Sequence, residues 1–138
     1  MIEFEKVEGT DNHCRILFEL LKERKYNISH NKLPDFQDHK RFVYNHPYIS
    51  WFIVKRNSEF LGSFYIKSDN SIGLNLIVHS QEIVEKIIDY IKNNFKPSKA
   101  FPSLVPSYFY LNISSQNFEL KAILEKMKIN TLQVSYKI

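Results

Sequence analysis

Glycine is scarce in this sequence. The 138 residues contain 3 glycines, and the last of them is Gly73. Loops that wrap phosphate groups need glycine where the backbone approaches the ligand closely or takes a positive φ. Because no glycine follows Gly73, the second half of the chain has no Walker-type or dinucleotide-binding loop. This absence excludes most classes of nucleotide-using enzyme.

Cysteine is scarcer still, since Cys14 is the only one. A single thiol forms no intramolecular disulfide and builds no structural zinc site, so a secreted disulfide scaffold and a zinc ribbon are both excluded. The spacing of His30, His39 and His46 matches no metal-binding signature, and we expect no bound metal. A reducing, cytoplasmic compartment fits this composition.

Long apolar runs and blocks of like charge are also missing. No stretch approaches the ~18 apolar residues of a membrane-spanning helix, and the opening residues alternate instead of forming a signal peptide. We therefore expect no membrane association. The 19 basic and 15 acidic residues give a net charge of +4 without a run of five like charges. A nucleic-acid-associated module is accordingly only a minor alternative.

Apolar residues, by contrast, are plentiful enough for one packed core. The chain is 43% hydrophobic and 25% charged, which excludes a disordered tail or a collagen-like rod. A length of 138 residues fits one domain, and we place that domain at 1–138.

The hydrophobic pattern predicts the elements and their order. Alternating, aromatic or β-branched runs predict strands at 2–5, 48–56, 60–67, 71–78, 108–113 and 132–138. Apolar residues spaced by three and four predict four helices that begin after Thr10, Asp35, Ser80 and Asn117. In the first helix this stripe consists of Cys14, Leu17, Phe18 and Leu21, and we interpret Cys14 as a packing residue. The resulting order, βααβββαβαβ, indicates an α+β fold with helices flanking a mainly antiparallel sheet.

Two groups of residues carry a family resemblance. The first is the element order together with the segment Tyr110-Leu111-Asn112-Ile113-Ser114-Ser115-Gln116-Asn117 and the later Leu124-Glu125-Lys126-Met127. The chain resembles the GNAT superfamily of N-acetyltransferases in these features. The second group looks like a bacterial and phage branch of that superfamily with poorly defined acceptors: Ile28-Ser29-His30, Leu33-Pro34, His39, Phe42-Val43, His46-Pro47-Tyr48 and Trp51.

The resemblance implies a cofactor site between the fourth and fifth strands. In the superfamily these strands splay apart around the pantetheine arm of acetyl-CoA, and a loop Gln/Arg-x-x-Gly-x-Gly/Ala holds the pyrophosphate at a helix N-terminus. Here Gln81 stands where the loop begins, but Val84 and Lys86 occupy the small-residue positions. Candidate cofactor-binding residues are Leu76, Ile77, Val78, Gln81, Lys86, Asn112 and Asn117.

We expect this cofactor site to be degenerate. Side chains at the two small-residue positions fill the space where phosphate oxygens need close backbone approach. Glu82 places a carboxylate at the helix end that would otherwise attract an anion. Ser80, Gln81 and Glu82 are better explained as an ordinary self-capped helix start.

The catalytic groups implied by the resemblance are also incomplete. Many relatives protonate the departing thiolate with a tyrosine seven residues after the asparagine that opens the last helix, and that count from Asn117 reaches Leu124. Leucine has no proton to give. Candidates for a chemical role are His79, at the end of the fourth strand, and Tyr110 on the fifth. An ordinary strand-end or sheet role for each is the alternative.

Polar and aromatic residues gather in the two-helix region, which lines the substrate mouth in this fold. The acceptor-side candidates are His30, His46, Tyr48 and Trp51, which could recognise a sugar or an amine by stacking and hydrogen bonding. In the alternative interpretation His39 packs on the inner face of its helix, while the segment from His46 to Tyr48 only ends that helix.

Three classes of function remain open. The first is a GNAT-fold protein with a degenerate acetyl-CoA site that binds a small molecule in the strand splay, or a partner, without catalysis. The second is an active acetyl-CoA-dependent acyltransferase on a small amine or amino sugar-nucleotide. The third is the nucleic-acid module. Exposed sheet edges also allow a homo-oligomer.

Overall fold

The structure is a computed structural model that describes residues 1–24, 32–99, 101 and 103–138. The described residues form a five-stranded sheet and four helices. The elements in chain order are β1 (Ile2–Lys6), α1 (Asp11–Lys22), α2 (Phe36–Tyr44), β2 (Ser50–Arg56), β3 (Glu59–Ile66), β4 (Ser71–Leu76), α3 (Gln81–Asn94), β5 (Tyr110–Asn112) and α4 (Phe118–Lys126).

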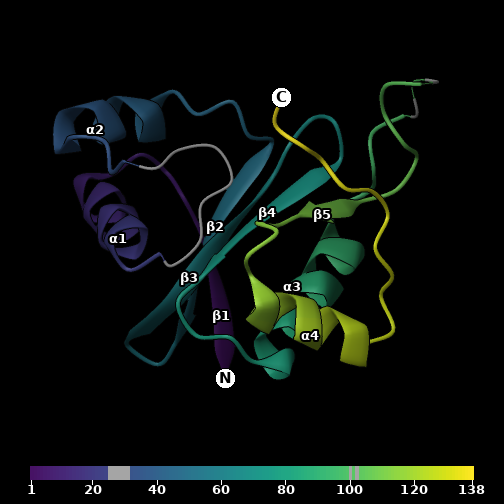
Figure 1. The fold of residues 1–138 in the computed structure, drawn as a ribbon. Helices are drawn as coiled ribbons and strands as arrows, with labels where there is room; N and C mark the ends of the chain where they lie inside the picture. Colours follow the sequence, from purple (N-terminus) through teal and green to yellow (C-terminus); the bar gives the residue numbers. More distant parts are fainter. Residues whose placement is uncertain (25–31, 100, 102) are drawn as a thin grey trace.

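The strands lie in the sheet in the order in which they occur in the chain, from β1 to β5. Neighbouring strands are antiparallel except β4 and β5, which pair in parallel across the long connection that contains α3. Helices α1 and α2 lie on one face of the sheet, and α3 and α4 lie on the other (Figure 1). The predicted α+β fold with a mainly antiparallel, helix-flanked sheet is confirmed.

Each helix begins at a side chain that caps it. In all four, the capping oxygen accepts a hydrogen bond from the backbone N–H three residues later, which satisfies one of the donors that a helix start leaves without an intrahelical partner. The capping residues are those after which the helices are predicted to begin, namely Thr10, Asp35, Ser80 and Asn117.

The larger part of the core lies between the sheet and the α3–α4 layer. Phe64 of β3 is fully buried there and packs on Phe52 of β2 with ring centroids 5.1 Å apart. The apolar stripe of α3 covers these rings, as its spacing predicts. Its buried members are Ile83, Val84, Ile87 and Ile91.

A smaller core lies under α1 and α2. Cys14 is completely buried in it, beside Leu17 and Leu20, and burial raises the pKa of its thiol. The interpretation of Cys14 as a packing residue is thus supported by its surroundings. The buried stripe of α1 is rotated slightly from the predicted one, because Leu20 is buried whereas Leu21 is only partly covered.

His39 connects the two helices of this layer. Its Nε2 atom lies 3.0 Å from the backbone oxygen of Cys14, and its ring packs beside Phe18 and Phe36. The residue is 3% exposed, and burial lowers the pKa of its imidazole. His39 is therefore a neutral donor in the core, as the packing interpretation predicts.

The predicted closing strand at 132–138 is wrong. These residues form no helix or strand, and their alternating apolar side chains are exposed. Alternation produces a strand only where a neighbouring edge supplies backbone partners. The strand predicted at 108–113 is also shorter than expected, since β5 spans only Tyr110–Asn112 and offers a short edge. The observed order is βααβββαβα.

The burial of His39 predicts that the protein loses stability in mild acid. Lowering the pH from about 7.5 to about 5.5 should lower the melting temperature, because the pKa of His39 in the folded state lies below the unfolded value of 6.5. The unfolded chain then binds more protons, so the contribution of His39 is complete above pH 6.5 and is lost as the pH falls towards the folded pKa. Calorimetric melting temperatures across this range test the prediction.

The matched variant is His39→Gln, which keeps a side-chain N–H donor but does not titrate. It should melt at a lower temperature than the wild type at pH 7.5 and show a shallower dependence on pH. His46, whose pKa burial also lowers, contributes to the slope in the same direction. An unchanged slope in His39→Gln would contradict the assignment.

Candidate functional site

The parallel strands β4 and β5 separate after three paired residues. Their register runs from Ser71 opposite Tyr110 to Gly73 opposite Asn112. Beyond this point β4 continues to Leu76, whereas β5 has ended. The sheet therefore opens between the two strands on the side where α3 begins.

The connection from β4 to α3 is short and closed by hydrogen bonds. Only residues 77–80 separate the strand from the helix. The N–H of Ile77 still donates to Leu61 of β3 at 3.0 Å, and Ser80 already caps α3 through the N–H of Ile83 at 3.2 Å. Two residues, Val78 and His79, are left to span the gap.

His79 ties this connection to α4. Its side chain is 6% exposed, and its Nδ1 atom lies 3.2 Å from Oε2 of Glu119 in the first turn of α4. The contact joins the end of β4 to the helix that follows β5. The candidate base thus sits beside the opening, buried against a carboxylate.

Charged and polar side chains at the start of α3 already have partners within the protein. Glu82 forms an ion pair with Arg56 at the end of β2. The side-chain amide of Gln81 donates to Glu85 one turn later at 2.8 Å. Lys86 is exposed on the helix. The expected attraction of a helix N-terminus for an anion is therefore opposed by the carboxylate of Glu82.

The remaining cofactor candidates are dispersed around the opening. Leu76 is buried in the core and Val78 is 38% exposed. Asn112 is exposed at the end of β5, whereas Asn117 caps α4 by accepting the N–H of Leu120 at 3.1 Å. Of these side chains, that of Asn117 has a structural task independent of any cofactor.

Tyr110 lies on β5 opposite Ser71 of β4. Burial raises the pKa of its phenol, and the carboxylate of Asp69 acts in the same direction through its charge and a hydrogen bond. The phenol is therefore protonated at neutral pH and could serve as an acid or a hydrogen-bonding group, but not as a base.

An aromatic cluster occupies the α1–α2 face of the sheet. Tyr48 stacks on Tyr65 of β3 with centroids 3.9 Å apart and an angle of 6° between the rings. Trp51 meets Tyr48 edge to face at 5.1 Å, and His46 lies 5.3 Å from Trp51. The acceptor-side candidates His46, Tyr48 and Trp51 are thus brought together. His30 lies outside the described residues.

A glycine makes room for this cluster. Tyr65 stands opposite Gly73 in the β3–β4 register, and a Cβ atom on Gly73 would lie 2.1 Å from Cζ of Tyr65. The Tyr65 ring therefore packs directly against the backbone of Gly73, and the Tyr48 ring stacks on it. The sequence analysis missed Tyr65 and Gly73 as members of this region, because their meeting depends on strand register.

The cluster is a poorly hydrated environment. Burial raises the pKa of the Tyr48 phenol, as do the charge and hydrogen bonding of Tyr65. Burial likewise lowers the pKa of His46. Both shifts favour the uncharged forms, so at neutral pH these side chains are neutral donors and acceptors.

Three polar atoms around the cluster are buried without a hydrogen-bond partner. Among the described residues they are Arg24 Nε, Trp51 Nε1 and Asn75 Oδ1. Trp51 is the register partner of Tyr65, and Asn75 follows Gly73 by two residues, so it lies on the same face of β4. Arg24 is close enough to Tyr65 to interact with it electrostatically, and burial lowers the pKa of its guanidinium.

These unpartnered atoms are unusual. Folded proteins pair nearly all buried polar groups, and each one left unsatisfied costs about 1–3 kcal/mol. Two of these atoms belong to side chains on one face of the sheet, those of Trp51 and Asn75, and the third belongs to Arg24, which interacts with Tyr65 on that face. Neither Arg24 nor Asn75 was predicted, because nothing in the local sequence signals an unpaired atom.

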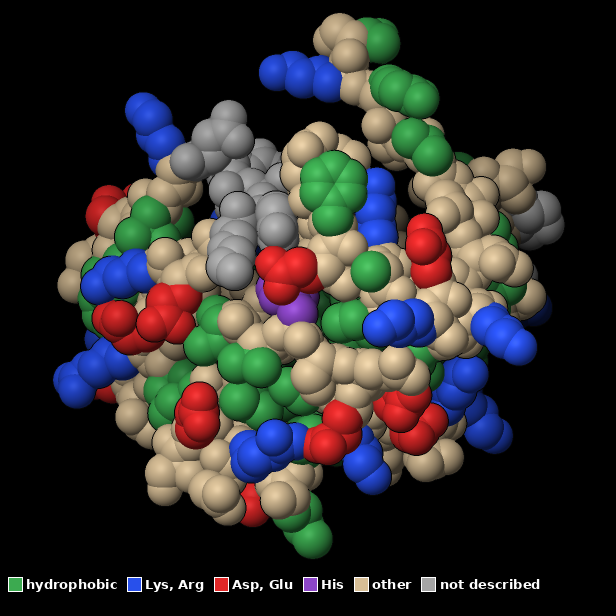
Figure 2. All heavy atoms as spheres, turned by 60° about the horizontal axis from the view of Figure 1, so that its bottom comes forward, with side chains coloured by type: hydrophobic (Ala, Val, Ile, Leu, Met, Phe, Trp, Pro, Cys, Tyr) green, Lys and Arg blue, Asp and Glu red, His purple; other side chains and the backbone are tan. Residues whose placement is uncertain are grey.

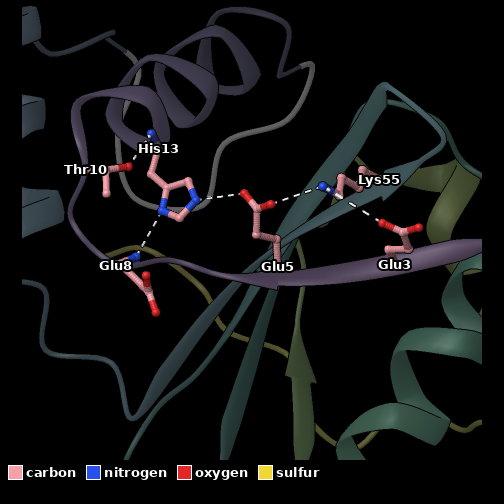
Figure 3. A network of polar contacts seen from close by, with 6 residues as sticks. All are labelled: Glu3, Glu5, Glu8, Thr10, His13 and Lys55. Carbon is pink, nitrogen blue, oxygen red and sulfur yellow. Dashed lines mark hydrogen bonds and ion pairs between the residues drawn. The ribbon is translucent and has the colours of Figure 1, made fainter.

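A second polar network joins β1, β2 and α1 near the other edge of the sheet (Figure 3). Glu5 receives a hydrogen bond from Lys55 at 3.0 Å and contacts Nε2 of His13 at 2.7 Å, and these two bonds lower the pKa of its carboxyl. Nδ1 of His13 accepts the N–H of Glu8 at 3.0 Å. Each ring nitrogen of His13 is thus engaged, and the network anchors α1 to the sheet.

The described residues contain neither a candidate metal site nor a membrane-spanning helix. No group of three or more His, Cys, Asp or Glu residues there could hold a metal ion. No helix among those residues is long and apolar enough to cross a bilayer. On the face shown in Figure 2, basic and acidic side chains are interspersed.

Comparison with known proteins supports the fold. No family model and no curated protein sequence matches the chain. A possible acetyltransferase from Clostridium difficile 630 has a similar structure, with a TM-score of 0.55 and 14% identity over 100% of this chain and 98% of that one. A domain from Methanocaldococcus jannaschii DSM 2661 has a TM-score of 0.62 and 13% identity over 93% and 87%. At this level of identity the similarity supports the α+β fold alone.

The contact between Gly73 and Tyr65 predicts a specific response to a single methyl group. Gly73→Ala should lower the free energy of unfolding by about 1–3 kcal/mol, because the Tyr65 ring is held between the glycine and Tyr48 and cannot move aside freely. It should also change the fluorescence of Trp51, the only tryptophan. Denaturant titration and emission spectra measure both effects.

The control places the same methyl group in a background without the ring. In Tyr65→Ala, adding Gly73→Ala should cost much less than it does in the wild type. Equal costs in the two backgrounds would show that the ring does not rest on Gly73.

Proposed function

We propose that this protein binds a small polar molecule on the α1–α2 face of its sheet, and that its acetyl-CoA site is degenerate. The observation that carries the binding role is the group of three buried polar atoms without partners beside the Tyr48–Tyr65 stack. A bound ligand would supply hydrogen-bond partners for these three atoms and thereby offset the cost of burying them. The GNAT-like fold serves here as the frame that holds these side chains.

The loss of the cofactor site rests on the connection between β4 and α3. Residues 77–80 carry one sheet hydrogen bond and the cap of α3, so they have no free loop to close over a diphosphate. Each charge-assisted hydrogen bond contributes about 1.5–3 kcal/mol. Losing two or three of them weakens a micromolar affinity into the millimolar range.

The unpartnered atoms also define the chemistry of the ligand. Arg24 and Trp51 offer donors, one of them cationic, and therefore suit a carboxylate or another anionic acceptor. Asn75 offers an acceptor and suits an N–H or O–H group. A small acid that also bears an amino or hydroxyl group satisfies all three.

An active acetyl-CoA-dependent N-acyltransferase is the second candidate. The opening between β4 and β5 favours it, because pantetheine lies between these strands in the superfamily that the chain resembles. In that case His79 and Tyr110 would be the groups available for proton transfer. The two functions differ in a measurable way, namely whether acetyl-CoA binds.

Titration with acetyl-CoA separates the two functions. In isothermal titration calorimetry we expect a dissociation constant above about 1 mM. The matched variant Lys86→Ala should bind acetyl-CoA as weakly as the wild type does, because an exposed lysine that contacts no phosphate contributes nothing to the affinity. Low-micromolar binding that weakens in Lys86→Ala would establish the acyltransferase and refute the degenerate site.

Replacing the unpaired acceptor should separate stability from binding. Asn75→Leu, which is close in volume, should leave the free energy of unfolding unchanged or raise it by up to about 1 kcal/mol, because it removes a buried acceptor that has no partner. It should also abolish the response of Trp51 fluorescence to small hydroxy and amino acids, which we expect in the wild type.

The outcome that would contradict the binding role is clear-cut. A loss of stability of 1 kcal/mol or more in Asn75→Leu would mean that the amide is already satisfied in the folded protein. The control Asn94→Leu, at the exposed end of α3, should leave any fluorescence response unchanged.

A further inference from the structure

Residues 131–138, called the arm below, combine a strand-like sequence with complete exposure. Their apolar residues alternate with polar ones, and all eight residues are exposed. In Figure 1 the yellow end of the chain is a coil and not a strand, and in Figure 2 an extended stretch of chain stands clear of the molecule. The exposed apolar side chains, with the exposed fraction of each, are Leu132 58%, Val134 64%, Tyr136 86% and Ile138 116%.

The sheet has an edge that suits such an arm. Among the described residues, β5 is hydrogen-bonded as a strand only to β4, so its outer edge is unpaired. Apolar side chains flank that edge, with Tyr108 48% and Phe118 64% exposed. Unpaired strand edges are sites where another strand can add.

Charge does not oppose contact between the arm and this edge. The arm contains one charged side chain, Lys137, and residues 108–113 contain none. Interface centres are typically depleted of charged residues and enriched in tyrosine and phenylalanine. Both surfaces have this composition.

We propose that the arm of each copy adds as a strand to the β5 edge of a second copy, and that the second copy returns the contact. Every molecule has both an arm and a β5 edge. One two-fold axis therefore pairs the two arms with the two edges of a dimer, and the assembly is closed. Within its own chain the apolar side chains of the arm are not buried. The apolar row of the arm then lies with Leu111 of β5 and the exposed Phe118, which extends the larger core across the dimer.

The period-two pattern provides a matched pair of variants for the test. Val134→Asp puts a charge in the apolar row, whereas Ser135→Asp puts the same charge on the opposite face of the arm. Light scattering after size-exclusion chromatography should give a dimer for the wild type and for Ser135→Asp at about 50 μM. Val134→Asp should be monomeric, with a dissociation constant raised at least tenfold and an unchanged circular dichroism spectrum.

A cross-link tests which segments meet. The double variant Asn112→Cys with Ser135→Cys should form a disulfide-linked dimer on mild oxidation, because Cys14 is completely buried and does not react. Each single variant should give much less of it. A monomeric wild type, a dimer that survives Val134→Asp, or equal cross-linking by the single variants would each overturn the proposal. None of these results depends on ligand or acetyl-CoA binding.

Discussion

The hydrogen bonds at the start of α3 constrain the rest of this account. A helix N-terminus after a parallel strand is a natural site for an anion, because its N–H groups have no partners in the helix. Here the Ser80 side chain accepts one of those N–H groups, that of Ile83, and Glu82 places a carboxylate in the first turn of the helix. Only residues 77–80 connect β4 to α3. The start of α3 is thus built as an ordinary capped helix.

The two faces of the sheet differ in whether their buried polar atoms have hydrogen-bond partners. On the α3–α4 side apolar residues interlock, and His79 is held by Glu119. On the α1–α2 side the Tyr65 ring packs against Gly73. Tyr48 stacks on Tyr65 and meets Trp51 edge to face. Polar atoms without partners occur around this stack. The proposed ligand site therefore lies on the α1–α2 side of the sheet.

Local signals in the sequence predicted most of the fold. Caps such as Ser80 and the stripe of α3 depend on residues within one or two turns, and both were correct. The closing strand was wrong because residues 132–138 pair with no strand of their own chain, and alternation alone does not create that pairing. The candidate site was only partly predictable: Tyr48 and Trp51 are near in sequence, whereas Tyr65 and Gly73 meet through register, and the unpaired atoms of Arg24 and Asn75 depend on tertiary packing.

The most direct test is to observe where a ligand changes the spectrum of the protein. In two-dimensional NMR of the ¹⁵N-labelled chain, the single Trp51 indole N–H gives one resolvable signal. The account predicts that a small hydroxy or amino acid shifts this signal and the side-chain amide of Asn75, while acetyl-CoA leaves the amides of residues 77–83 unmoved. Shifts of residues 77–83 with low-micromolar acetyl-CoA, and a silent Trp51, would contradict it.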